Sequence, residues 1–125
     1  MTSPTPPRVL IVDDDPALLG ALEFALTAEG YEVRGCAGAD AALEGAHGPL
    51  ACMVIDYKLP DIDGIALADR LRAAGVGAPL ILITSNPDAR CRARAARGGA
   101  VIVEKPLLGD RLLRQIRALA GAPPP

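Results

Sequence analysis

Carboxylate, hydroxyl and ammonium side chains stand directly after four short apolar runs of the chain. In chain order they are Asp13, Asp14, Asp15, Asp56, Thr84, Ser85, Glu104 and Lys105. The runs before them span residues 9–12, 50–55, 80–83 and 100–103. Each residue alone is a weak signal, but together they predict one shared site if the four runs end at the same edge of a sheet.

The chemistry that this set suits is phosphoryl transfer to an aspartate. Carboxylates brought together repel one another, and a divalent cation removes that cost. All-oxygen ligands with room for water suit Mg²⁺. A carboxylate can also attack phosphorus and form an acyl phosphate. A lysine ammonium neutralises the charge of the transferring group, and a hydroxyl hydrogen-bonds one of its oxygens.

The elements that must position these residues alternate between two sequence periods. The four unbroken apolar runs predict strands buried on both faces of a parallel sheet. Segment 31–36 alternates in polarity and predicts an edge strand. Helical patterns fill the gaps at about 18–26, 39–46, 65–71, 87–97 and 112–119. Five strand–helix units predict an open α/β sheet with helices on both faces and functional groups at the carboxyl ends of the strands.

Composition limits the class of protein. The chain has 125 residues, the size of one domain, and half of them are hydrophobic. A net charge of −2 argues against a dedicated nucleic-acid binder. No apolar stretch approaches the roughly 20 residues of a membrane span. Three cysteines without CxxC spacing predict reduced thiols in a cytoplasmic protein.

The two ends and the only histidine carry little chemistry. Residues 1–7 (MTSPTPP) predict a Pro-rich extension, and residues 121–125 (GAPPP) predict a tail or linker. The folded domain is therefore expected over 8–120. His47 lies in a Gly/Ala-rich stretch, where neither a zinc site nor a His-based triad can be assembled around it.

Four motifs resemble the response-regulator receiver domains of two-component signalling, often called CheY-like. They are VLIVDDDP (9–16), VIDYKLPDIDG (54–64), LILITS (80–85) and VEKP (103–106), in the family's order and near its spacings. The resemblance covers about residues 8–120. It implies a flavodoxin-like (βα)5 fold with a five-stranded parallel sheet of order 2-1-3-4-5. It also implies a switch that catalyses only its own phosphorylation and dephosphorylation.

The resemblance also implies a role for each site residue. Asp56 is the phosphoacceptor, and Thr84 and Lys105 contact the phosphoryl group. The bond between Lys105 and Pro106 is expected to be cis. The implied protein ligands of Mg²⁺ are Asp14 directly, Asp13 through water, Asp56, and the backbone carbonyl of Lys58.

The partners follow from the same resemblance. A sensor histidine kinase or a histidine phosphotransfer protein is the expected donor, docking on the first helix. Phosphorylation is expected to switch the surface of the fourth helix, fifth strand and fifth helix, which is also a possible homodimer contact. Neither nucleic acid nor a membrane is expected as a direct partner, and the downstream protein or output domain stays open.

Several polar residues near the site favour a purely structural interpretation. Asp15 before Pro16 is typical of a helix N-cap. Asp61, Asp63 and Gly64 are expected to shape the loop after Asp56 and to cap the next helix. A further set, Arg90, Arg94 and Arg97, shares one helix face. A solvated basic face is favoured there over a docking surface for an acidic partner or a second copy.

Two departures from the family bear on readout and lifetime. Ile102 stands where the family usually has a Tyr or Phe that rotates inward, so we expect the signal to leave by displacement of the loop and helix. Lys58 and Asn86 occupy positions that flank the path of the hydrolytic water. Lys58 can hold the phosphoryl group there, which predicts slow self-dephosphorylation.

Two rival functions remain open from the sequence. A pseudo-receiver would bind partners without taking phosphate, but the complete set of acids with Thr84 and Lys105 argues against it. A phosphatase using Asp56 as nucleophile would need a second acid close after it, and Lys58 occupies that position.

Overall fold

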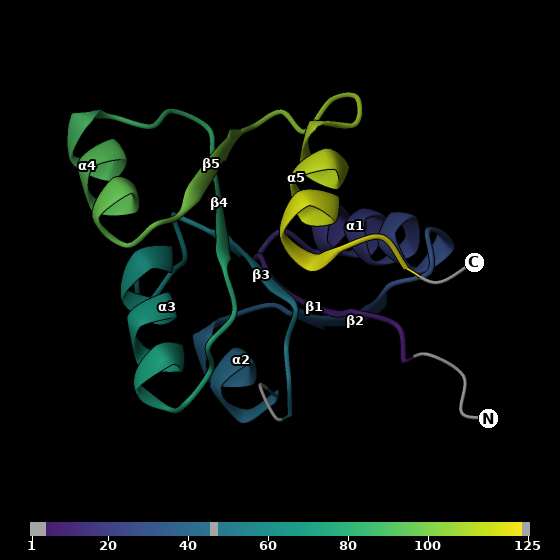
Figure 1. The fold of residues 1–125 in the computed structure, drawn as a ribbon. Coiled ribbons are helices and arrows are strands. Elements are labelled where there is room, and N and C mark those ends of the chain that lie inside the picture. The colour runs from purple at the N-terminus through teal and green to yellow at the C-terminus, as the bar shows by residue number, and fades with distance from the viewer. Residues whose placement is uncertain (1–4, 46–47, 124–125) are drawn as a thin grey trace.

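Strands and helices alternate without exception along the part of the chain that the computed structural model describes, residues 5–45 and 48–123 (Figure 1). The strands are β1 (Arg8–Val12), β2 (Glu32–Cys36), β3 (Cys52–Asp56), β4 (Leu80–Thr84) and β5 (Val101–Glu104). The helices are α1 (Pro16–Ala28), α2 (Ala39–Gly45), α3 (Gly64–Ala73), α4 (Ala89–Arg97) and α5 (Arg111–Ala120).

The five strands form one parallel sheet in the order β2-β1-β3-β4-β5. The predicted flavodoxin-like topology and the edge position of β2 are therefore confirmed. Register determines what meets at the carboxyl edge. Val12 is paired with Ile55, so the next residues, Asp13 and Asp56, lie level with each other on neighbouring strands.

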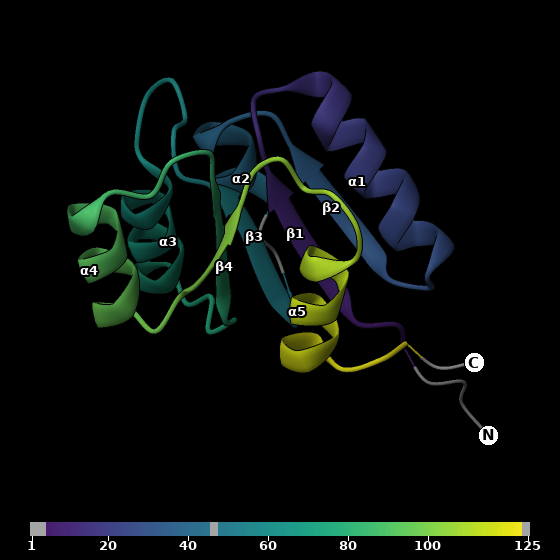
Figure 2. The ribbon, with the colours of Figure 1, turned by 90° about the horizontal axis from the view of Figure 1, so that it is seen from above.

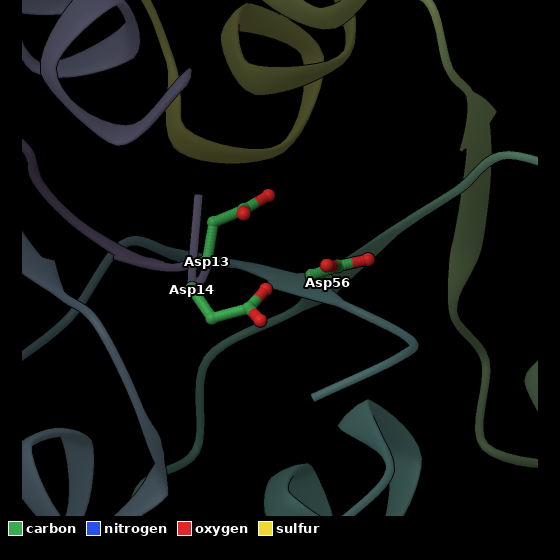
Figure 3. Close-up of side chains that lie close together, drawn as sticks. All are labelled: Asp13, Asp14 and Asp56. Carbon is green, nitrogen blue, oxygen red and sulfur yellow. The ribbon is translucent and has the colours of Figure 1, made fainter. Parts of the chain in front are cut away.

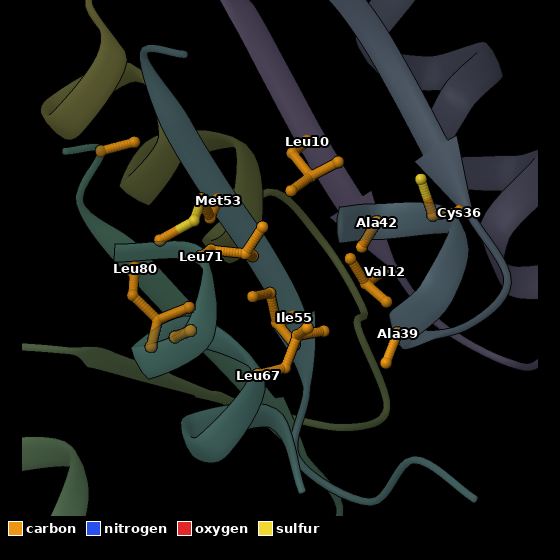
Figure 4. Packing of buried hydrophobic residues seen from close by; sticks show 12 residues of the cluster. Leu10, Val12, Cys36, Ala39, Ala42, Met53, Ile55, Leu67, Leu71 and Leu80 are labelled. Carbon is orange, nitrogen blue, oxygen red and sulfur yellow. The ribbon is translucent and has the colours of Figure 1, made fainter. Parts of the chain in front are cut away.

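Helices cover both faces of the sheet (Figure 1 and Figure 2). Alternate residues of the strands face one or the other of these two layers. Leu10, Val12, Met53 and Ile55 pack against α2 and α3, as the close-up of this cluster shows (Figure 4). The other face packs against α1 and α5 through Val9, Ile11, Cys52, Val54, Ile81 and Ile83. Burial of each large aliphatic side chain contributes about 1.5–3 kcal/mol, so the sheet is a firm platform for the loops at its edge.

A third, smaller cluster attaches α4 to the rest of the fold. It consists of Ile65, Leu82, Cys91 and Ala95, with Tyr57, Ala100 and Ile102 packed against it. The only buried side chains that α4 itself contributes are the small ones of Cys91 and Ala95. The apolar attachment of this nine-residue helix is therefore thin.

Several boundaries differ from the sequence prediction. Asp56, Thr84 and Glu104 are the last residues of their strands rather than the first residues after them, because pairing continues through them. The third strand begins at Cys52, two residues later than predicted. The strand predicted from Tyr31 begins at Glu32, because the Tyr31 N–H donates to the carbonyl of Leu26 in α1 instead of to a neighbouring strand.

Aspartate side chains cap the starts of α1, α3 and α4. Asp15 accepts from the N–H groups of Ala17 and Leu18, and Pro16 is the first helical residue, which confirms its structural role. Asp88 caps α4, so the predicted start at residue 87 was wrong by two positions. An Asp side chain satisfies N–H groups that a helix start leaves unpaired, and the helix begins after it.

No helix within the described ranges is both long and apolar enough to cross a membrane. Three predictions fall partly or wholly outside the described residues. They concern His47, residue 46 at the end of the helix predicted over 39–46, and parts of both Pro-rich ends.

Candidate functional site

Three carboxylates gather at the carboxyl edge of the sheet (Figure 3). Asp13 and Asp14 follow β1, and Asp56 ends β3 on the neighbouring strand. One oxygen from each lies within 4.8 Å of the others. Asp13 and Asp56 are buried, whereas Asp14 is exposed. The predicted acidic set is thus brought together, with one side open to solvent.

The backbone around Asp13 holds its carboxylate in place. The N–H of Asp13 donates to the carbonyl of Cys36 in β2 at 3.1 Å. Its Oδ1 accepts from the N–H of Asp15 at 2.8 Å. Its Oδ2 is buried and has no hydrogen bond among the described residues, only an ion pair with Lys105. A fixed carboxylate oxygen short of donors is suited to a cation.

Lys105 supplies the only ammonium of this cluster among the described residues. Its Nζ lies 3.3 Å from Asp13 Oδ2 and 3.3 Å from Asp56 Oδ2. The backbone N–H of Lys105 donates to the carbonyl of Thr84 at 2.9 Å, and the peptide bond from Lys105 to Pro106 is cis, as predicted. β4 and the loop after β5 thus place this side chain over the acids.

The charges of this cluster are unbalanced. Burial raises the pKa of Asp56; Lys105 opposes this, and the charge of Asp13 adds to it. Burial alone would lower the pKa of Lys105, but Asp56 and Asp13 outweigh it and raise that pKa. One ammonium pairs with two of the three carboxylates, and this leaves an excess of negative charge. A divalent cation at this place would remove it.

Oxygen chemistry at this cluster fits a hard cation. All three side chains offer carboxylate oxygens, the ligands that Mg²⁺ prefers, and the exposed side of Asp14 leaves room for water. The acidic triad is therefore able to bind a metal. The part of the chain that the structure describes contains no other group of three or more such residues.

Thr84 lies at the end of β4, one strand away from Asp56. Its side chain is buried, and its Oγ1 has no hydrogen-bond partner in the described part of the protein. A buried hydroxyl without a partner costs about 1–3 kcal/mol. Such a group is available to a ligand oxygen that reaches the site.

The loop 57–63 turns back on Asp56. The backbone N–H of Lys58 acts to lower the pKa of the Asp56 carboxyl, while the Lys58 side chain is exposed. Gly64 donates its N–H to Tyr57 at 2.8 Å. A Cβ on Gly64 would lie 2.4 Å from the Asp56 carbonyl oxygen, so only glycine fits there. Asp63 caps α3 through Ala66 at 2.8 Å, which confirms its predicted capping role.

One contact at the site was missed by the sequence analysis. Arg94 was expected on a solvated face with Arg90 and Arg97, but it is half-buried and binds Asp63 through its two terminal guanidinium nitrogens. It also donates to the Tyr57 hydroxyl at 3.2 Å. No local sequence pattern predicts a contact between residues 31 positions apart, because such a contact depends on how α3 and α4 are placed relative to each other.

A comparison with protein families matches residues 9–117 to the response regulator receiver domain. The match covers most of the chain. The chain therefore belongs to the response-regulator receiver family, CheY-like, of two-component signalling. Its function is phosphorylation-dependent signalling through an aspartate site, and it is not a conventional enzyme.

Individual proteins with similar sequences or structures support the same assignment. The transcriptional regulatory protein FixJ of Bradyrhizobium diazoefficiens is 33% identical over 113 residues, which are 89% of this chain and 55% of that protein. A CheY-like receiver domain protein from Methanospirillum hungatei has 30% identity and a TM-score of 0.81, covering 91% and 93% of the two chains. This chain spans 25% to 55% of the length of the first curated relatives that it matches.

A third relative bears on the metal. The response regulator TrrA from Thermotoga maritima, solved in complex with Mg²⁺ and beryllofluoride, is 27% identical with a TM-score of 0.77. The alignment covers 90% of this chain and 98% of that one. A related receiver thus holds Mg²⁺ together with a small inorganic fluoride complex.

Proposed function

We propose that Asp56 accepts a phosphoryl group from a phosphohistidine on a sensor histidine kinase or a histidine phosphotransfer protein. The observation that carries this is the convergence of Asp13, Asp14 and Lys105 on the carboxylate of Asp56. A carboxylate oxygen of Asp56 forms a bond to phosphorus while the bond from phosphorus to the histidine nitrogen breaks. The imidazole then leaves with the electron pair of that bond.

Mg²⁺ is the proposed cofactor, and it would supply charge neutralisation of the transferring phosphoryl group. The proposed ligands are Asp14 and Asp56 directly, Asp13 through water, and the backbone carbonyl of Lys58. In support, the three carboxylates lie within reach of one another, and the loop with Lys58 returns to Asp56. The Mg²⁺-bound structure of TrrA also supports the choice of metal.

Lys105 and Thr84 are proposed to bind the acceptor-bound phosphoryl group. The Lys105 ammonium ion-pairs with Asp56 at 3.3 Å and would follow the added negative charge. The Thr84 hydroxyl lacks a partner among the described residues and would donate to a phosphoryl oxygen. The phosphoryl group would bring three strong acceptor oxygens to the site, so both groups gain a stronger acceptor.

Partners and location are also proposals. The donor is proposed to dock on α1. The added charge would switch the surface of α4, β5 and α5, which would bind a downstream protein or a second copy of the chain. We place these events in the cytoplasm, where sensor histidine kinases donate phosphoryl groups from their phosphohistidine. The extension at 1–7 and the tail at 121–125 are proposed to flank a receiver domain over 8–120.

Acetyl phosphate and MgCl₂, followed by intact-mass measurement, test the proposal. The expected result is a gain of one phosphoryl group in the wild-type protein and in Asp61→Asn, but none in Asp56→Asn. Asp61 is the matched control because it lies in the loop after Asp56 but outside the acidic triad. Absence of the gain from all three proteins, with kinase as well as with acetyl phosphate, would favour a pseudo-receiver.

A further inference from the structure

Both ends of the loop after Asp56 are held by one side chain from α4. Tyr57 is the first residue of this loop, and Asp63 is the last before α3. The Arg94 guanidinium lies 3.0 Å and 3.1 Å from the two Asp63 carboxylate oxygens. It also lies 3.2 Å from the Tyr57 hydroxyl, with its carbon 5.9 Å from the centre of the ring. We call Tyr57, Asp63 and Arg94 the Arg94 clamp.

The clamp contains the less exposed of the two ion pairs that α4 makes within the described residues. The other one, between Arg92 and Glu104, joins two side chains that are 57% and 49% exposed. Ion pairs that exposed contribute little. The Arg94 side chain is 23% exposed and makes a two-point contact, which is stronger and more directional. With only Cys91 and Ala95 buried from α4, the clamp is a large part of what positions this helix.

The clamp also touches the residue next to the reacting carboxylate. Tyr57 follows Asp56 directly, and its N–H donates to Ile83 in β4 at 2.8 Å. Its side chain packs with Ile102 against the small cluster beneath α4. Ile102 has no polar group, whereas Tyr57 adds a hydroxyl at the same cluster. Lys58 follows Tyr57 and is bridged to Asp63 across the loop, so a movement of the loop at Lys58 reaches both residues that contact Arg94.

We propose that Arg94 is a positioning residue that transmits the state of Asp56 to α4 through Tyr57 and Asp63. This inference rests on the proposed phosphorylation of Asp56. When the loop adjusts to the metal and the phosphoryl group, the geometry at Tyr57 and Asp63 changes, and the rigid guanidinium fork requires α4 to follow.

Hydrogen–deuterium exchange of α4 amides tests this coupling, with Mg²⁺ alone and with Mg²⁺ plus beryllofluoride. In the wild-type protein, the α4 exchange rates are expected to differ between the two conditions. In Arg94→Gln that difference is expected to shrink by about threefold to tenfold, the size typical of single residues that couple two sites. Arg90→Gln is the matched control, because Arg90 is exposed on the same helix one turn earlier.

Further variants separate coupling from folding. Tyr57→Phe removes only the hydroxyl and is also expected to reduce the difference in α4 exchange rates between the two conditions. This variant tests the coupling if Arg94→Gln does not fold. An α4 difference equal to wild type in the variants, or no α4 difference in the wild-type protein, would overturn the inference. Acetyl phosphate labelling is measured in parallel. If acetyl phosphate labels the protein but Arg94→Gln leaves the α4 exchange difference unchanged, the clamp alone is contradicted. If acetyl phosphate does not label the protein, the proposed function is contradicted.

Discussion

The ammonium of Lys105 lies 3.3 Å from the Asp56 carboxylate, so the proposed acceptor is ion-paired before any phosphoryl group arrives. Lys105 is 22% exposed and Asp56 only 8%, so the pair is reached from the lysine side. This arrangement holds the cation where new negative charge would form. A substitution of either residue also disturbs the other. Substitutions of neighbouring residues therefore give results that are easier to interpret.

Mg²⁺ is expected to stabilise the folded protein through the acidic triad. A ligand at ten times its Kd contributes about 1.4 kcal/mol. Thermal unfolding with and without MgCl₂ should show a higher Tm for wild type, a much smaller increase for Asp14→Asn, and an unchanged response for Asp61→Asn. Equal increases in all three proteins would contradict the proposed ligand set.

Asp15 is expected to matter for stability and not for the metal. Its side chain accepts from Ala17 at 3.0 Å and caps α1. Loss of such a cap costs about 1 kcal/mol. Asp15→Ala should therefore lower the free energy of unfolding in urea by about that amount, while the Mg²⁺-dependent increase in Tm stays as in wild type. Asp15→Ser retains a cap and is the control; a lost Mg²⁺ response in Asp15→Ser would make Asp15 a ligand after all.

Thr84→Val is expected to separate stability from signalling. Valine keeps the shape and removes the hydroxyl that lacks a partner among the described residues. The free energy of unfolding without phosphodonor should stay the same or rise by up to about 1 kcal/mol. The α4 response to beryllofluoride should weaken. A clear loss of stability in denaturant unfolding would show that the hydroxyl already has a partner in the unphosphorylated protein.

Asp63→Asn is expected to have a pH-dependent cost. Burial alone would raise the pKa of Asp63, but hydrogen bonds from Arg94 and the Ala66 N–H outweigh it and hold it below its ordinary value of 3.8. The folded state therefore favours the charged form, and this stabilisation is present above pH 3.8 and lost as the pH falls through the lower, folded-state pKa.

Denaturant unfolding of wild type and Asp63→Asn across pH measures that cost. Asparagine keeps one oxygen as the cap acceptor but loses the charge and the second oxygen that accepts from Arg94, so the difference measures the two-point ion pair. It should be about 0.5–1 kcal/mol at neutral pH, since the pair is partly exposed, and should vanish in acid. A difference that persists unchanged below pH 3.8 would point to the cap instead of the ion pair.

Lys58→Ala is expected to shorten the lifetime of the phosphorylated protein. The Lys58 side chain is exposed beside the acceptor, where it can hold the phosphoryl group and obstruct water. A loss of ~0.4–1.4 kcal/mol of barrier corresponds to roughly two- to tenfold faster hydrolysis. Intact-mass measurement after removal of phosphodonor gives the half-life, with Asp61→Asn as control. An unchanged half-life would sink the idea.

Much of the fold and site could be predicted because both depend on short-range signals. Buried strands appear as unbroken apolar runs, and parallel strands end at one edge, so Asp13, Asp56 and Thr84 had to meet there. Caps such as Asp15 are equally local. The contacts of Arg94 were not predictable, because they depend on the rotation of α4 about its axis. Tyr31 is similar: its hydroxyl donates to the Gly121 carbonyl, 90 positions away.

Three unmodified thiols lie in three different parts of the interior. Cys36 belongs to the layer under α2 and α3, Cys52 to the layer under α1 and α5, and Cys91 to the cluster beneath α4. Burial raises the pKa of Cys52 to about 12 and raises those of the other two, so none is reactive in place. Alkylation at each cysteine therefore reports the opening of its own layer, and the native chain carries three built-in probes of local unfolding.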